Sequence, residues 1–241
     1  MQTLSQSFLD SCSRQKGYIL RGENMTRIET FVDAAFAFAF TMLIISVDEI
    51  PNSVETLFAS AKDIPAFLVS CINIGFIWYS HSVFSRRFGL QDGKTIILSL
   101  SLVMLVLVFI YPLKLVFMGL FHWLSGGYLS SGLGSMTEMQ LSDLFVFFAV
   151  GMLMLAIISY LMLKNVLRQA YFLGLTEFEI YSSKTDLIYW IIVVFISFLA
   201  ILLAKTLSGL WITSSGFVYF LLYFSAKVLQ KHRARNEPAK E

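Results

Sequence analysis

Two polar side chains inside apolar stretches are the first candidates for chemistry in this sequence. Asp33 stands in the run from Met25 to Val47, and His81 stands late in a second apolar run that begins at Ile64. An unpaired carboxylate in hydrocarbon costs several kcal/mol, so we expect Asp33 to find a partner on the second run or in the loop after it. Trp78 and His81 are three residues apart and share one face of a helix. We expect His81 to form a structural hydrogen bond to Asp33 or to a neighbouring carbonyl. A role as a proton relay or as a ligand is the alternative.

The sequence carries no pattern typical of a metal site, a disulfide framework or an enzyme. Cys12 and Cys71 lie far apart, and no second histidine or cysteine stands at metal-ligand spacing from His81. No nucleophile lies near a base at motif spacing, and no phosphate-binding loop is present. We therefore expect two free thiols, no metal, no cofactor and no enzymatic activity. The net charge of +2 gives no indication of a nucleic-acid partner.

The elements that must position these residues are membrane-spanning helices. Of the 241 residues 57% are hydrophobic and only 14% are charged, whereas a soluble domain carries roughly 25% charged residues. A spanning helix needs about 20 mostly apolar residues. The sequence therefore predicts an all-α protein with six transmembrane helices in a lipid bilayer, near Met25–Val47, Ile64–Phe84, Thr95–Leu115, Leu144–Leu163, Leu187–Ala204 and Leu207–Leu229. Lys205 and Thr206 would form a tight hairpin between the last two, and His122–Asp143 would be the one long loop.

The distribution of positive charge predicts the orientation. Fifteen of the 18 lysines and arginines fall in the N-terminal arm, the second-to-third and fourth-to-fifth loops, and the tail. Only Lys62, Lys114 and Lys205 fall on the opposite side. Because cationic loops are retained in the cytoplasm, both termini are predicted inside the cell membrane. The domain boundaries follow as a cytoplasmic arm over residues 1–24, a six-helix domain over 25–229 and a basic tail over 230–241, which we expect to be disordered near anionic lipid.

The first predicted helix has two unlike faces. On a helical wheel the residues within about 60° of Phe38 run from a basic end to an acidic end: Arg27, Phe31, Ala34, Thr41, Met42, Ile45 and Glu49. The opposite side carries Asp33, Phe36 and Phe40. This pattern predicts that the aspartate is buried against other helices, while the Phe38 face serves either simple helix packing or a pore.

These residues resemble a known signature. Arg27 is followed, after three residues, by Phe31-Val32-Asp33. This segment resembles the Arg-x-x-x-Phe-Ser-Asp motif of the transmembrane protein 175 family, which comprises the endosomal and lysosomal potassium channels and their bacterial relatives. The resemblance covers about the first 115 residues, and the further matching positions are Ala34, Phe36, Ala37, Ala39, Thr41, Trp78, His81, Arg87, Asp92, Tyr111 and Pro112. The last three predicted helices match only in number, spacing and hydrophobicity.

The resemblance implies a homotetramer of six-helix subunits whose first helices surround a pore that conducts monovalent cations, potassium above all. It places Phe38 at the main constriction, Met42 and Ile45 one and two turns outward, and Thr41 in a hydroxyl layer beside the constriction. A single six-helix unit implies a prokaryotic plasma membrane, since the animal members fuse two such units. Two departures stand out: Val32 replaces the signature serine, and Phe38 stands where bacterial members carry isoleucine or leucine, which closes the pore more firmly unless the rings tilt aside.

The sequence-based hypothesis is therefore a passive cation channel with a hydrophobic constriction. Glu49 and Asp48 would attract cations to the outer mouth. Arg27 would anchor Asp33 or Asp92, because four arginines at an axis would repel cations. The alternative is a proton-coupled secondary transporter that uses Asp33 and His81, against which the sequence shows no inverted repeat and no matched pair of broken helices.

Overall fold

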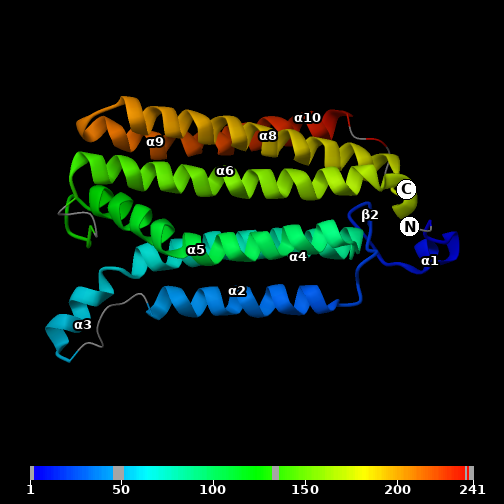
Figure 1. The fold of residues 1–241 in the computed structure, drawn as a ribbon, viewed down its shortest axis with the longest axis horizontal. Helices are drawn as coiled ribbons and strands as arrows, with labels where there is room; N and C mark the ends of the chain where they lie inside the picture. Colours follow the sequence, from blue (N-terminus) through cyan, green and yellow to red (C-terminus); the bar gives the residue numbers. More distant parts are fainter. Residues whose placement is uncertain (1–2, 46–51, 132–135, 237, 239–241) are drawn as a thin grey trace.

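The chain folds as a bundle of long helices that run side by side (Figure 1). The computed structural model describes residues 3–45, 52–131, 136–236 and 238. Its long helices are α2 (Arg27–Ile45), α4 (Ile64–Phe88), α5 (Gly93–Leu124), α6 (Glu138–Arg168), α8 (Glu177–Thr206) and α10 (Leu221–Asn236). The short elements are α1 (Gln6–Ser11), β1 (Arg14–Gln15), β2 (Tyr18–Ile19), α3 (Val54–Ala61), α7 (Ala170–Leu173), α9 (Ser214–Phe217) and the 3₁₀ turns η1 (Gly209–Thr213) and η2 (Val218–Phe220).

Several of these helices are long and apolar enough to cross a membrane. The described residues contain five such segments, namely α4, α5, α6, α8 and the stretch Trp211–Asn236. The chain is thus an all-helical, multi-pass membrane protein, as predicted. Helix α2 is not among the five, and it carries three charged residues, Arg27, Glu29 and Asp33, within its 19 residues.

The spanning helices are longer than the apolar runs that predicted them. Helix α6 begins with a capping box in which Thr137 and Gln140 exchange side-chain-to-backbone hydrogen bonds, and Thr176 and Glu179 do the same at the start of α8. Such boxes satisfy backbone N–H groups that a helix start leaves unpaired. The helices therefore extend past the hydrophobic segment into polar sequence, and the predicted long loop shrinks to the stretch between α5 and α6.

The C-terminal part of the chain corrects two expectations. The turn after α8 falls at Leu207 and Ser208 rather than at Lys205 and Thr206, and short 3₁₀ and α segments precede α10 instead of one continuous helix. The tail was expected to be disordered, yet α10 continues to Asn236. Its continuation has a physical reason, because Arg233 forms a salt bridge with Asp186 of α8 at 3.6 Å.

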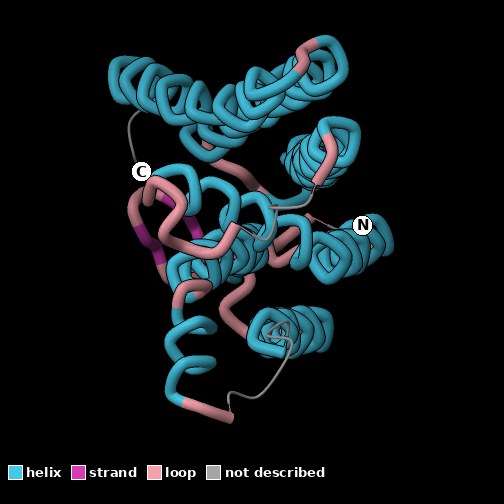
Figure 2. Tube along the Cα trace, turned by 90° about the vertical axis from the view of Figure 1, so that its left-hand side faces the viewer, coloured by secondary structure: helices cyan, strands magenta, loops and turns pink. Residues whose placement is uncertain are grey.

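The arrangement of the helices places α2 at the edge of the bundle. Figures 1 and 2 both show α2 on one side of α4 and α5, with α8 and α10 on the far side. Helix α1 and the end of α10 lie at the same end of the bundle (Figure 1). The largest core cluster joins α2 to its neighbours, with Phe36 and Leu43 packed among side chains of α4, α5 and α6. One side of α2 is thus covered by its own chain.

Candidate functional site: the uncovered face of α2

The covered side of α2 follows a helical period. Val32, Phe36, Ala39 and Leu43 are each no more than 2% exposed. Their spacing of three and four residues puts them on one stripe, as expected for a helix that packs against a core. This stripe fixes the rotation of α2 about its own axis and so decides which residues point away from the chain.

The opposite side of α2 is left open by the chain. Phe31 is 54% exposed and Phe38 is 55% exposed. Arg27, Ala34 and Thr41 are exposed as well. These five residues are the part of the predicted wheel face that the structure leaves uncovered, and we call them the open face of α2. Large apolar groups that stay exposed in a single chain require either lipid or another protein surface to cover them.

The structure does not show the other residues predicted for this face as exposed. Met42 is half-buried and packs against the main core cluster. Ile45 is the last residue of α2. Asp48 and Glu49, predicted at the outer mouth, lie outside the described residues.

The hydroxyl of Thr41 is oriented by a hydrogen bond within α2. Its Oγ1 donates a hydrogen bond to the backbone carbonyl of Phe38 at 2.7 Å, one turn earlier in the same helix. Because the proton is used inside the helix, the lone pairs of the hydroxyl oxygen point outward. The open face of α2 therefore offers an oxygen acceptor one helical turn after Phe38.

Asp33 has the partner that the sequence required. The indole Nε1 of Trp78 on α4 donates to Asp33 Oδ1 at 2.7 Å. An indole N–H can only donate, so the direction of this hydrogen bond is unambiguous. The bond joins α2 to α4 near the start of α2. Arg27, in contrast, forms no salt bridge with Asp33 or with Asp92 in the described part of a single chain.

His81 bonds to a different residue from the one expected. It is 6% exposed, and its Nε2 lies 2.9 Å from the hydroxyl oxygen of Ser99 on α5. The imidazole therefore connects α4 to α5 rather than bonding to Asp33. A serine hydroxyl can donate or accept, so this bond persists with the neutral ring in either tautomer.

Asp92 lies just before α5, where it joins that helix to α6. Its Oδ1 accepts from Thr95 Oγ1 at 2.6 Å, and the Asn165 amide donates to both carboxylate oxygens, at 3.1 and 3.2 Å. Burial raises the pKa of the Asp92 carboxyl, but the hydrogen bonds from Thr95, Asn165, Gln169 and the Lys94 backbone together bring it below its ordinary value. Asp92 is thus a charged structural link.

Asp33 and His81 also line one cavity. It has a volume of about 470 Å³, and its other lining residues include Glu23, Glu29 and Arg86. A cavity of this size with polar walls is large enough to hold many water molecules. Within the described residues, no group of three or more His, Cys, Asp or Glu side chains has the geometry to hold a metal ion.

The sequence reasoning missed a buried ion pair. Arg21 in the N-terminal arm and Glu179 on α8 form a salt bridge at 2.7 Å, and their side chains are 1% and 0% exposed. Glu179 also accepts from the backbone N–H of Ile19 at 2.9 Å. The arm is therefore fastened to α8 rather than free in solvent. The one sequence signal for this pair was the Thr176-x-x-Glu179 pattern, which is typical of a capping box and marks Glu179 as part of a helix start.

The fold and the open face of α2 define a multi-pass helical membrane protein with an exposed aromatic and hydroxyl stripe on an edge helix. The family model described as "Endosomal/lysosomal potassium channel TMEM175" matches residues 27–112. A protein of Marivirga tractuosa named "Potassium channel" is 33% identical over 214 residues, which cover 85% of each chain. The chain belongs to the TMEM175 family, so the resemblance seen in the sequence is confirmed.

A solved structure extends the comparison to the last helices. A variant of the potassium channel MtTMEM175, crystallised with a nanobody–MBP fusion protein, superposes with a TM-score of 0.79 at 29% identity. The match covers 93% of this chain and all of that chain. The helices after residue 115, which the motifs did not reach, thus share the fold of that channel.

Proposed function

We propose that the chain assembles as a homotetramer in which four copies of α2 surround a passive, potassium-preferring cation pathway. The observation that carries the proposal is the open face of α2: its own chain packs one side of the helix and leaves Phe38 and Thr41 uncovered. Helix α2 lies at the edge of the subunit, where neighbouring copies can reach it (Figure 2). Membership of a potassium-channel family favours a pore over lipid as the partner of this face.

In this arrangement Phe38 forms a ring of four side chains at the narrowest point. Met42 and Ile45 continue the apolar neck outward, and dewetting of this neck controls passage. Thr41 supplies hydroxyl oxygens beside the ring to a partly dehydrated cation. Glu49 and Asp48 concentrate cations at the outer mouth, and α2 counts as the first of six membrane spans. Both termini lie on the cytoplasmic side of a prokaryotic cell membrane.

The proposal is tested by comparing two phenylalanine substitutions in lipid bilayers. Phe38→Ala removes the ring from the proposed constriction and is expected to raise the single-channel current under a potassium gradient. Phe195→Ala is the matched control, because Phe195 is 69% exposed on α8, a helix on the far side of the bundle from α2 (Figure 1). Reversal potentials under opposed potassium and sodium gradients measure the preference. An unchanged current in Phe38→Ala, or a monomeric mass for the purified protein, would refute the assignment.

The cavity shared by Asp33 and His81 is the observation that favours the proton-coupled alternative. A transporter of this kind would show a flux that saturates with potassium and depends on an imposed pH gradient. Our proposal expects a flux that follows the electrochemical gradient of potassium alone. Measuring potassium uptake into liposomes with and without a pH gradient separates the two functions.

A further inference from the structure

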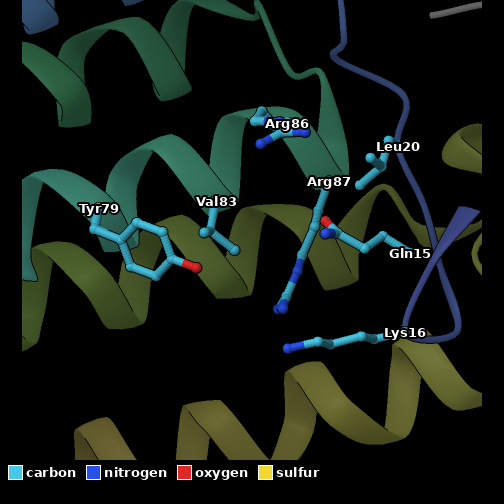
Figure 3. A pocket seen from close by; sticks show the side chains of 7 residues that line it. All are labelled: Gln15, Lys16, Leu20, Tyr79, Val83, Arg86 and Arg87. Carbon is cyan, nitrogen blue, oxygen red and sulfur yellow. The ribbon is translucent and has the colours of Figure 1, made fainter. Parts of the chain in front are cut away.

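A second, smaller cavity lies between the N-terminal arm and the end of α4. Its volume is about 80 Å³, which is several times the space that one water molecule needs. Figure 3 shows its lining, which consists of Gln15, Lys16 and Leu20 from the arm and Tyr79, Val83, Arg86 and Arg87 from α4. The cavity therefore has a strongly cationic polar part and an apolar part.

The cations in this cavity form no close ion pair among the described residues, although Arg86 also lines the neighbouring cavity that contains Glu23, Glu29 and Asp33. No carboxylate is among its lining residues, all of which the structure describes. Neither Lys16 nor Arg86 belongs to any of the three salt bridges among the described residues. The Arg87 guanidinium lies 3.7 Å from the centre of the Tyr18 ring, and it forms no salt bridge within the described residues. The ends of Lys16 and Arg87 point into the same space (Figure 3), so an anion placed there would relieve their repulsion.

Backbone contacts hold together the two segments that carry these cations. Lys16 occupies the turn of the β1–β2 hairpin with φ at +54°, a conformation in which lysine is uncommon and asparagine, aspartate or glycine is preferred. The N–H of Gly22 donates to the carbonyl of Arg86 at 3.0 Å. A Cβ on Gly22 would lie 2.3 Å from the carbonyl oxygen of Ser85, so the arm touches the backbone of α4 directly. The backbone on both sides of the cavity is thus held in contact at Gly22.

The apolar part of the cavity continues along a spanning helix. From Val83 and Tyr79 toward the N-terminus of α4, the exposed residues Phe76, Ile72 and Leu68 follow at helical spacing. A cationic pocket at the foot of an exposed apolar stripe matches a phospholipid, whose phosphate lies at the membrane surface and whose acyl chains lie in hydrocarbon. Free phosphate would use the cations but not the stripe.

We infer that the cavity formed by Lys16, Arg86 and Arg87 binds the phosphate of an anionic phospholipid, with an acyl chain along the exposed face of α4. The bound lipid fastens the N-terminal arm to the membrane surface next to the start of α2. This site is separate from the proposed pore and does not depend on it. A failed pore test leaves the lipid prediction unchanged, and the reverse holds too.

The test measures lipid binding to the purified full-length protein in detergent by native mass spectrometry. The probes are dioctanoyl phosphatidylglycerol, dioctanoyl phosphatidylcholine and inorganic phosphate. We expect saturable binding of the anionic lipid, weaker binding of the zwitterionic lipid, and no displacement by millimolar phosphate. Lys16→Gln and Arg86→Gln should each weaken phosphatidylglycerol binding about fivefold, the effect of one cation near a membrane surface.

Arg168→Gln is the matched control. Arg168 is exposed at the end of α6, at the same end of the bundle, and does not line the cavity. It should leave lipid binding unchanged. Equal losses in Arg168→Gln and Arg86→Gln would show diffuse surface charge and overturn the site, as would unchanged binding in the Lys16→Gln, Arg86→Gln double variant. Displacement by phosphate would overturn the assignment to lipid. Thermal unfolding of each variant verifies folding, and Arg86→Lys should restore binding.

Discussion

Breaking the ion pair between Arg21 and Glu179 is the sharpest test of how the N-terminal arm is held. Glu179 is fully buried and accepts from Arg21 Nη1 at 2.8 Å and Nη2 at 2.7 Å. Glu179→Gln keeps the size and one acceptor oxygen but leaves the Arg21 guanidinium buried without a counter-charge. Loss of one partner of a buried pair costs about 3–5 kcal/mol. In a chain of this length that loss lowers the midpoint of thermal unfolding by roughly 10 °C.

The companion variants isolate the charge. Arg21→Met alone leaves a buried carboxylate and should be comparably harmful. The double variant, Arg21→Met with Glu179→Gln, leaves no buried charge and should unfold at a higher temperature than either single variant. Asp143→Asn is the control, because the Lys205–Asp143 pair is 54% and 61% exposed and should contribute no more than about 1 kcal/mol.

The assay combines thermal unfolding in detergent with limited trypsin digestion of the arm. Trypsin cleaves after lysine and arginine, so the β1–β2 hairpin should become accessible in both single variants before the helices unfold. If the effects of the two single substitutions simply add in the double variant, or if Glu179→Gln unfolds as Asp143→Asn does, the pair does not hold the arm and the reasoning fails.

Three further predictions follow from single contacts. Trp78→Phe leaves Asp33 without its donor and should lower the unfolding midpoint by several degrees, an effect that Asp33→Asn should reduce when the two are combined. Because the pKa of Asp92 is lowered in the folded state, its stabilising effect is complete above the ordinary carboxyl pKa and is lost as the pH falls through the folded value; Asp92→Asn should remove this acid-dependent part of the unfolding midpoint. Gly151→Ala would place a Cβ 2.0 Å from the Phe109 ring, so it should destabilise the α5–α6 contact by about 1–3 kcal/mol in the same thermal assay.

The two faces of α2 could be predicted from sequence because they depend on one short helix. A wheel centred on Phe38 needs only the helical period, and the structure exposes Phe31 and Phe38 while it buries Phe36. The partner of Asp33 was likewise expected on the second predicted helix or in the loop after it, because a free carboxylate in hydrocarbon is costly. The partner does lie on that helix, but it is Trp78 rather than His81 or Arg27. In both cases the physical constraint is local or strong enough to leave few choices.

The contacts that the sequence did not predict are those without a local signal. Arg21 and Glu179 are 158 residues apart, and Glu179 precedes the apolar run that marked the fifth span. His81 was expected to bond to Asp33 or to a neighbouring carbonyl, but its partner is the hydroxyl of Ser99 in an apolar segment. Hydropathy identifies where a helix is apolar, and it says nothing of where polar ends continue or which helices become neighbours.

The described residues at the start of α2 are fastened to the rest of the subunit, whereas the face proposed to line the pore is left open. The arm that precedes α2 is held to α8 by Arg21 and Glu179 and to α4 by backbone contact at Gly22. Asp33 and Trp78 tie the first turns of α2 to α4. A helix that is fixed in rotation at its start can present Phe38 to the same point in every copy of the chain. For a hydrophobic constriction this precision is essential, because a ring of side chains closes or opens with small rotations of the helices that carry it.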